Sequence, residues 1–141
     1  MTGIADSGTG NISGTMRNFT DAPVTVTFTI TPTSGAGCTG DDITAEVTVN
    51  PEPQIEAAPD DQTVCSNTPI ADIILPVTNG VPVANYAWTR NNTTSVTGIA
   101  DSVSGNISGT MRNLTSSPVT VTFTITPESD LGCSGEPIEA T

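Results

Sequence analysis

The stretch PVTVTFTITP occurs twice in the chain, at residues 23–32 and 118–127. Within it, valine, phenylalanine and isoleucine alternate strictly with threonine over 24–31 and 119–126. Such alternation predicts a strand with one buried and one solvent-exposed face. The flanking prolines fit strand ends, because a missing N–H costs least there. The stretch therefore predicts an antiparallel, half-buried β-structure.

Both strands belong to a longer repeat. Residues 2–46 and 97–141 align without a gap and are identical at 32 of 45 positions. The offset of 95 residues is about the length of one immunoglobulin-like sandwich. We predict that residues 1–50 are the C-terminal half of one repeat, and that 51–141 are a nearly complete second repeat without its final strand. The chain is then expected to be a piece of a longer tandem array.

Further segments carry strand signals. Alternation indicates strands at 43–49 and 84–90, an apolar run predicts a buried strand at 70–76, and 106–113 fits an edge strand interrupted by a glycine. The NPEP at 50–53 reads as a short, stiff linker. Six or seven short strands in about 90 residues predict an all-β, immunoglobulin-like two-sheet sandwich.

Composition restricts the function. The chain has 15 acidic residues, 3 arginines, no lysine and no histidine, giving a net charge of −12. Nucleic acids and anionic membranes require a basic face, so we expect neither as a partner. No apolar run is long enough to cross a membrane as a helix. The 26 threonines favour strands and a polar surface, which is typical of an extracellular domain.

The sequence predicts no enzyme and no cofactor. Without histidine or lysine, a serine nucleophile lacks its ordinary base, and no GxSxG is present. Calcium is the alternative to consider, at Asp60–Asp61 after the linker or at Asp41–Asp42. Hard cations need several converging oxygens, however, and no D-x-D-x-D-G loop exists. A solvated acidic surface is therefore preferred to a metal site.

The chain has three cysteines, and Cys38 and Cys133 occupy the same repeat position. A complete repeat would thus carry one cysteine of each type, which favours a structural disulfide between Cys65 and Cys133 with Cys38 as a free thiol. Two alternatives stay open: that all three thiols are free, or that Cys38 is linked to Cys65.

Tyr86, Trp88 and Arg90 share one face of their predicted strand. An exposed aromatic face of this kind can bind carbohydrate. The preferred interpretation is that Trp88 fills the sandwich core, because it is the only tryptophan and the other core candidates are mostly aliphatic. We expect it to lie near the disulfide.

The ordered landmarks DQTVCSNTPIADI, NYAWTRNN, GNISGTMRN, PVTVTFTITP and GCSG resemble the PKD-like, immunoglobulin-like repeats of long Bacteroidota surface proteins, such as gliding-motility adhesins of the SprB type. The resemblance covers essentially the whole chain. It implies a secreted, cell-surface filament exported by type IX secretion, and it does not imply catalysis.

Two functional hypotheses follow. The first is a structural stalk repeat of a filamentous adhesin, which gives length and mechanical strength. The second is a module that itself binds polysaccharide or a surface. The expected partners are neighbouring repeats of the same protein. For the broken half-repeat 1–50, the alternatives are disorder, packing against residues 51–141, or completion by another molecule. Completion from outside is preferred, by a neighbouring copy or through strand exchange with another copy.

Overall fold

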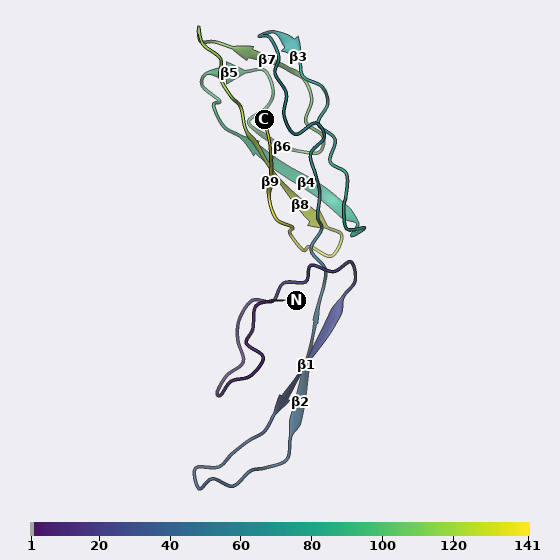
Figure 1. Ribbon diagram of the computed structural model, residues 1–141, viewed down its shortest axis with the longest axis vertical. Coiled ribbons are helices and arrows are strands. Elements are labelled where there is room, and N and C mark those ends of the chain that lie inside the picture. The colour runs from purple at the N-terminus through teal and green to yellow at the C-terminus, as the bar shows by residue number, and fades with distance from the viewer. Residues whose placement is uncertain (1) are drawn as a thin grey trace. The chain divides into compact units, whose positions relative to one another are not determined.

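The computed structural model describes residues 2–141. The chain divides into two compact units, unit 1 (Met1–Pro51) and unit 2 (Glu52–Thr141). Every named element in the described residues is a β-strand, as predicted (Figure 1). Between residues 2 and 141 we find no helix with the length and apolarity to cross a bilayer.

Unit 1 is organised by one long hairpin. Strand β1 (Val24–Ile30) pairs antiparallel with β2 (Ile43–Val49) along its whole length, from Val24 opposite Val49 to Ile30 opposite Ile43. The threonines on one face pair across the strands, with Thr25 Oγ1 3.2 Å from Thr48 Oγ1. Cross-strand contacts of this kind stabilise a hairpin by tenths of a kcal/mol each, up to about 1 kcal/mol.

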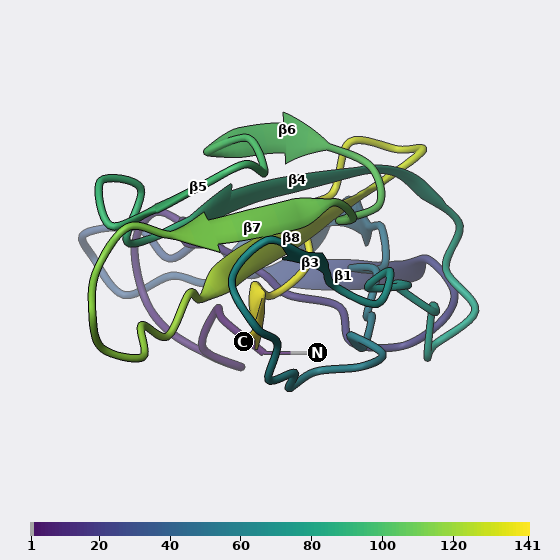
Figure 2. The ribbon, with the colours of Figure 1, turned by 90° about the horizontal axis from the view of Figure 1, so that it is seen from above.

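Unit 2 contains two sheets. The larger has the order β6 (Ser102–Ser104), β4 (Val83–Arg90), β8 (Phe123–Ser129) and β9 (Ile138–Ala140), and Figure 2 shows β6 beside β4. All its neighbours are antiparallel. The smaller sheet has the order β3 (Thr68–Pro69), β7 (Thr110–Asn113) and β5 (Val96–Thr97).

One apolar cluster fills unit 2, and strands of both sheets contribute to it. Its fully buried members include Ile73, Ile107, Phe123 and Ile125, each at most 1 % exposed. The alternating strand β8 supplies Phe123 and Ile125 from one face, as its sequence predicts. The all-β, immunoglobulin-like sandwich expected from the sequence is therefore confirmed.

Three predicted strands differ from the observed ones. The segment 106–113, expected as an edge strand, forms a strand only over β7 (Thr110–Asn113), and β7 is the central strand of the smaller sheet because β3 and β5 pair with its two edges. The strand expected at 119–126 begins only at Phe123 and continues to Ser129, because residues 119–122 have no partner strand within the described chain. The segment 70–76 forms single bridges rather than a regular strand. Ile73 bridges Ile107 and is buried, whereas Ile74 bridges Ala58 and is 54 % exposed. The segment thus changes partner between two adjacent isoleucines.

The two copies of the repeat share their local backbone. Gly98 has φ +119°, and a Cβ there would lie 2.1 Å from the Thr110 carbonyl oxygen. Its equivalent Gly3 has φ +133° and the same close approach to Thr15, at 1.8 Å. Only glycine tolerates both conditions. The turns that follow β1 and β8 also make equivalent hydrogen bonds, between a serine and a cysteine in each turn.

Candidate functional site

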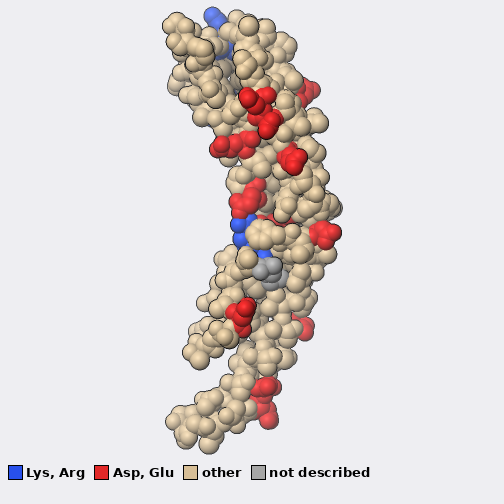
Figure 3. Space-filling view, viewed as in Figure 1, with Lys and Arg blue, Asp and Glu red and all other residues tan. Residues whose placement is uncertain are grey.

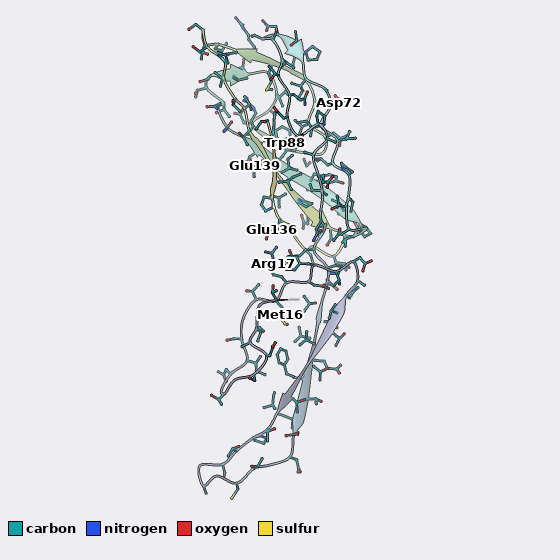
Figure 4. All side chains as sticks on the ribbon, in the orientation of Figure 1. Met16, Arg17, Asp72, Trp88, Glu136 and Glu139 are labelled. Carbon is teal, nitrogen blue, oxygen red and sulfur yellow. The ribbon has the colours of Figure 1, made fainter. Side chains whose placement is uncertain are left out.

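The strongest candidate for a binding surface in the sequence is the face of β4 that carries Tyr86, Trp88 and Arg90. In the structure all three side chains point to the interior of unit 2, and Trp88 lies within it (Figure 4). Trp88 is 4 % exposed and packs edge-on against Phe123, with ring centroids 5.6 Å apart and planes at 75°. Edge-to-face aromatic pairs add about 0.5–1.5 kcal/mol beyond their buried area.

This geometry removes the aromatic platform. The Tyr86 hydroxyl donates to the Leu75 carbonyl at 3.1 Å, so the polar end of the ring is also engaged inside the unit. The Trp88 indole N–H is buried and has no hydrogen-bond partner among the described residues. A sugar could not reach the Trp88 ring without opening the core, and the partly buried Tyr86 packs against the same apolar cluster. Trp88 therefore acts as a core residue.

Arg90 is the polar centre of this buried face, and its role was not anticipated from the sequence. Its side chain is 2 % exposed. Nε lies 3.1 Å from both the Ile99 and the Ala100 carbonyl oxygens, and Nη1 donates to Val96 O at 3.0 Å. Nη2 donates to Asp101 Oδ1 at 2.7 Å, an ion pair whose carboxylate side is 67 % exposed.

The guanidinium therefore holds the segment from Val96 to Asp101 against strand β4 through these hydrogen bonds. Its planar fork of donors can serve several carbonyls at once, which a lysine could not do. A buried charge without such partners would be expensive. The alternation in ANYAWTR placed Arg90 on the same strand face as Trp88. This spacing was the signal in the sequence from which the burial of Arg90 could have been predicted.

The predicted disulfide is not formed. Cys38, Cys65 and Cys133 are all free thiols, the first two exposed and Cys133 half-buried. Trp88 consequently has no disulfide beside it, contrary to the expectation. Of the interpretations that the sequence left open, the structure has the one with three free thiols.

The reason is their placement within unit 2. Cys65 lies just before β3, where its carbonyl accepts from Thr68 N. Cys133 lies just after β8, where its N–H donates to Ser129 Oγ at 3.1 Å. Strand β3 and the end of β8 are at opposite ends of the unit (Figure 1). A disulfide needs Cα atoms within about 7 Å, so the spacing in sequence was misleading.

Cys38 and Cys133 do occupy equivalent turns. Cys38 N donates to Ser34 Oγ at 3.1 Å, the same contact that Cys133 makes with Ser129. In each turn the serine N–H donates back to the cysteine carbonyl at 2.9 Å. The repeat therefore preserves a Ser–Cys turn rather than a cysteine pairing.

Acidic side chains are dispersed and do not form a cluster. On the face seen in Figure 3 they lie in separate patches, and Asp72, Glu136 and Glu139 lie apart from one another in Figure 4. In residues 2–141 no three or more Asp, Glu, Cys or His side chains gather as a metal site would require. Asp60 and Asp61 both contact Thr141. Thr141 N donates to the backbone carbonyl of Asp60 at 2.8 Å, and Thr141 Oγ1 donates to Asp61 Oδ1 at 3.4 Å.

The family was identified by comparison with family models. The model of the PKD-like domain matches residues 1–53 and 62–141, which is nearly all of the chain. The chain belongs to the PKD-like domain family. The two matched ranges correspond closely to the two units of the fold. Searches of curated proteins and of solved structures gave no match.

Membership of this family supports a general functional class. PKD-like domains are β-sandwich modules that are typically extracellular and non-catalytic. The buried aromatic face, the dispersed acids and the threonine-rich exterior of this PKD-like chain agree with that class. Its distinguishing property is the tandem repetition of one PKD-like sequence.

Proposed function

We propose that this PKD-like chain is a stalk repeat of a filamentous bacterial cell-surface adhesin. In this role it gives the adhesin length and resists pulling during attachment or gliding. The support from sequence is the tandem repeat and the resemblance to secreted gliding-motility adhesins. The support from structure is the way in which unit 2 ties its first residues to its last.

The observation that carries the proposal is a parallel pairing between the two ends of unit 2. Thr141 N donates to Asp60 O at 2.8 Å, and Gln62 N donates to Thr141 O at 2.8 Å. This staggered pattern is that of parallel strands. When the two ends are pulled apart, parallel neighbours slide in opposite directions and their bonds are loaded together. Bonds loaded together resist more force than bonds that open one after another.

Antiparallel hydrogen bonds near the start of unit 2 also resist a pull on that end. Ala58 N donates to Ile74 O at 2.9 Å and Ile74 N returns a bond to Ala58 O at 3.0 Å. A pull on the start of unit 2 must therefore slide this segment past 74–78 before it reaches the Thr141 pairing. Beyond it lies the buried cluster, which unfolds only when water enters.

Single-molecule force spectroscopy on the full chain, held at its two ends, tests the proposal. The informative variant is Gln62→Pro, which removes the N–H that donates to Thr141. Its matched control is Gln62→Ala, because the Gln62 side chain also binds Ala71 N and O and both variants lose those bonds. The difference between the variants isolates the backbone bond to Thr141.

We expect one well-resolved unfolding event for unit 2, at a force that falls clearly in Gln62→Pro and only slightly in Gln62→Ala. Forced unfolding is governed by the unfolding rate, so the loss should appear as faster rupture at constant force. Equal forces in the two variants, or the absence of a distinct event, would contradict a role of this backbone bond in resisting force.

A further inference from the structure

We propose that Asn79 is a site of spontaneous deamidation promoted by the fold, and that its conversion to aspartate or isoaspartate loosens segment 52–54 from unit 2. Asn79 and Gly80 lie in the turn that precedes β4. They form the only Asn–Gly pair in the sequence. Deamidation begins when the backbone nitrogen of the following residue attacks the asparagine side chain, so the size of that residue decides how readily the attack occurs.

Gly80 presents an unhindered backbone nitrogen. Each of the other nine asparagines precedes a residue that carries a side chain, whereas Gly80 has no Cβ to crowd the attack. Gly80 is exposed to solvent and has φ +73°, which favours glycine. Its N–H donates to no acceptor within residues 2–141. Water or hydroxide can therefore remove the proton that must leave this nitrogen.

The Asn79 side chain presents its carbonyl to two backbone donors. Asn79 Oδ1 accepts from Gln54 N at 3.0 Å and from Val81 N at 3.4 Å. Asn79 Nδ2 donates to Glu52 O at 2.8 Å, which holds the amide in this orientation. When the Gly80 nitrogen attacks Cγ, negative charge develops on Oδ1, and donors already aimed at that oxygen stabilise it. The fold therefore promotes the attack at this carbonyl.

The reaction needs no reagent except water. The Gly80 nitrogen gives its proton to water or hydroxide, and its electron pair forms a bond to Asn79 Cγ. The Cγ–Nδ2 bond then breaks, and Nδ2 leaves as ammonia after taking up a proton. Water opens the resulting succinimide at one of its two carbonyls, which gives aspartate or isoaspartate. Because the attacking nitrogen must lose a proton, the rate should rise with pH.

The same side chain attaches segment 52–54 to unit 2. Deamidation removes the donor to Glu52 O and leaves a carboxylate oxygen beside that carbonyl oxygen. Two oxygens without a proton between them repel each other, so Glu52 must move away. Isoaspartate also lengthens the backbone of the turn by one methylene.

The segment has little room to absorb this displacement by a small shift. Pro53 is fully buried, and a Cβ at Gly135 would lie 2.0 Å from Pro53 O. Thr78 N donates to Gln54 O at 2.8 Å, so the next residue is held as well. We therefore expect the displacement of Glu52 to weaken the bond between Thr78 and Gln54.

The loosening would matter for the stalk function, in a consequence that rests on that proposed function. A pull on a stalk repeat enters unit 2 through segment 52–54. Deamidation is irreversible, so it would change the mechanics of a filament with age. The experiment below applies no force, and its outcome is therefore independent of whether the chain is a stalk.

The test compares the full chain with the capped synthetic peptide PVTNGVPV, which has the sequence of residues 76–83 and lacks the donor from Gln54. Both are incubated in the same buffers, at neutral and at mildly alkaline pH. Peptide mapping by mass spectrometry follows every asparagine, because replacing the amide by a carboxyl group adds one dalton. Gln54→Pro removes the N–H that donates to Asn79, and Gln54→Ala is the matched control that keeps it.

We expect deamidation to concentrate at Asn79 and to be at least as fast in the chain as in the peptide. It should slow about tenfold or more in Gln54→Pro and stay unchanged in Gln54→Ala, because only the first variant loses a donor to the developing oxyanion. Trp88 emission verifies that both variants are folded. Slower deamidation in the chain than in the peptide, or a rate in Gln54→Pro equal to or above that in Gln54→Ala, would overturn promotion by the fold.

Hydrogen exchange tests the consequence for segment 52–54. The Thr78 amide should exchange faster in the deamidated chain than in the fresh chain, because its acceptor on Gln54 is loosened. Asn79→Asp, which has one of the two products from the start, should show a faster Thr78 exchange without incubation. Unchanged exchange at Thr78 in both samples would overturn the loosening.

Discussion

Units 1 and 2 contain nearly the same 45-residue sequence in two different surroundings. Ile107 is completely buried in unit 2, whereas its equivalent Ile12 in unit 1 is 47 % exposed. Phe123 is 1 % exposed, and its equivalent Phe28 is only half-buried. The hairpin register and the turns are nevertheless the same in both. The 45-residue repeat therefore determines its own hydrogen-bond register and turns. The burial of its apolar side chains depends in addition on the strands that residues 52–96 supply.

The difference has a thermodynamic consequence. Every member of the buried cluster lies in unit 2, on both sides of its sandwich. Burying one large apolar side chain is worth about 1.5–3 kcal/mol, so unit 2 gains most of the hydrophobic stabilisation of the chain. Unit 1 depends on a hairpin ladder, and an isolated hairpin is marginally stable in water.

The sharpest test of this comparison is the same truncation in both copies. Phe123→Ala should destabilise unit 2 by about 3–5 kcal/mol, because it removes a fully buried ring that packs on Trp88. Phe28→Ala should cost unit 1 about 1 kcal/mol, since that ring is only partly buried. Urea unfolding followed by Trp88 emission reports unit 2, and hydrogen exchange in β1 and β2 reports unit 1. Similar losses in both units would refute the comparison.

The next largest effect is expected at Arg90, which has no counterpart within residues 1–51. Arg90→Met should destabilise unit 2 by about 2–4 kcal/mol, because the buried carbonyls of Val96 and Ile99 lose their donor. Arg90→Lys retains the charge without the fork of donors and should recover only part of this loss. Urea unfolding measures both variants. Full stability in Arg90→Met would show that the guanidinium does not hold this segment.

A smaller contrast is expected at the two equivalent asparagines. Asn18→Ala should cost about 1–2 kcal/mol, since it removes the bonds to Ala22 and Val49 from a buried position. Asn113→Ala should cost less, because Asn113 makes no bond to a strand at that position. Hydrogen exchange at the adjacent turns and strand ends gives both values. An equal or larger loss at Asn113 would contradict the structural difference between the copies.

The smallest effect concerns the thiols. Under denaturing, non-reducing conditions all three cysteines should react with a maleimide. In the native chain, Cys38 should react faster than its equivalent Cys133, because Cys133 is half-buried. Mass spectrometry after short labelling times measures the order, and Cys133→Ser assigns the slow site. A count of one thiol in the denatured chain would restore the disulfide predicted from sequence.

The sequence was sufficient for the features that depend on local chemistry. Alternating valine and threonine fixed the β1–β2 hairpin, and the prolines and glycines marked its turns. The 95-residue offset identified equivalent residues such as Cys38 and Cys133. The burial of Trp88 could be inferred from its scarcity and its strand face.

Features that depend on distant partners were missed. Whether Val119–Thr122 forms a strand is decided by a neighbour on its free edge, about which its own pattern carries no information. The pairing of Cys65 depends on which end of the sandwich each cysteine reaches. Likewise, the Arg90 guanidinium donates to three backbone carbonyls and one carboxylate between Val96 and Asp101, and no side-chain pattern reveals the direction of the backbone there.

The burial of Arg90 also bears on how long such a chain survives among proteases. Enzymes of the trypsin class cut after lysine or arginine, and this sequence offers them only Arg17, Arg90 and Arg112. Arg90 lies in the central strand β4 with its side chain enclosed, and Arg112 lies in β7, paired with β5 on one side and β3 on the other. Cleavage at either bond must wait for the strand to open, so it occurs at the rate set by local unfolding. Digestion of unit 2 by such enzymes is thereby slowed by the same contacts that hold its sandwich together.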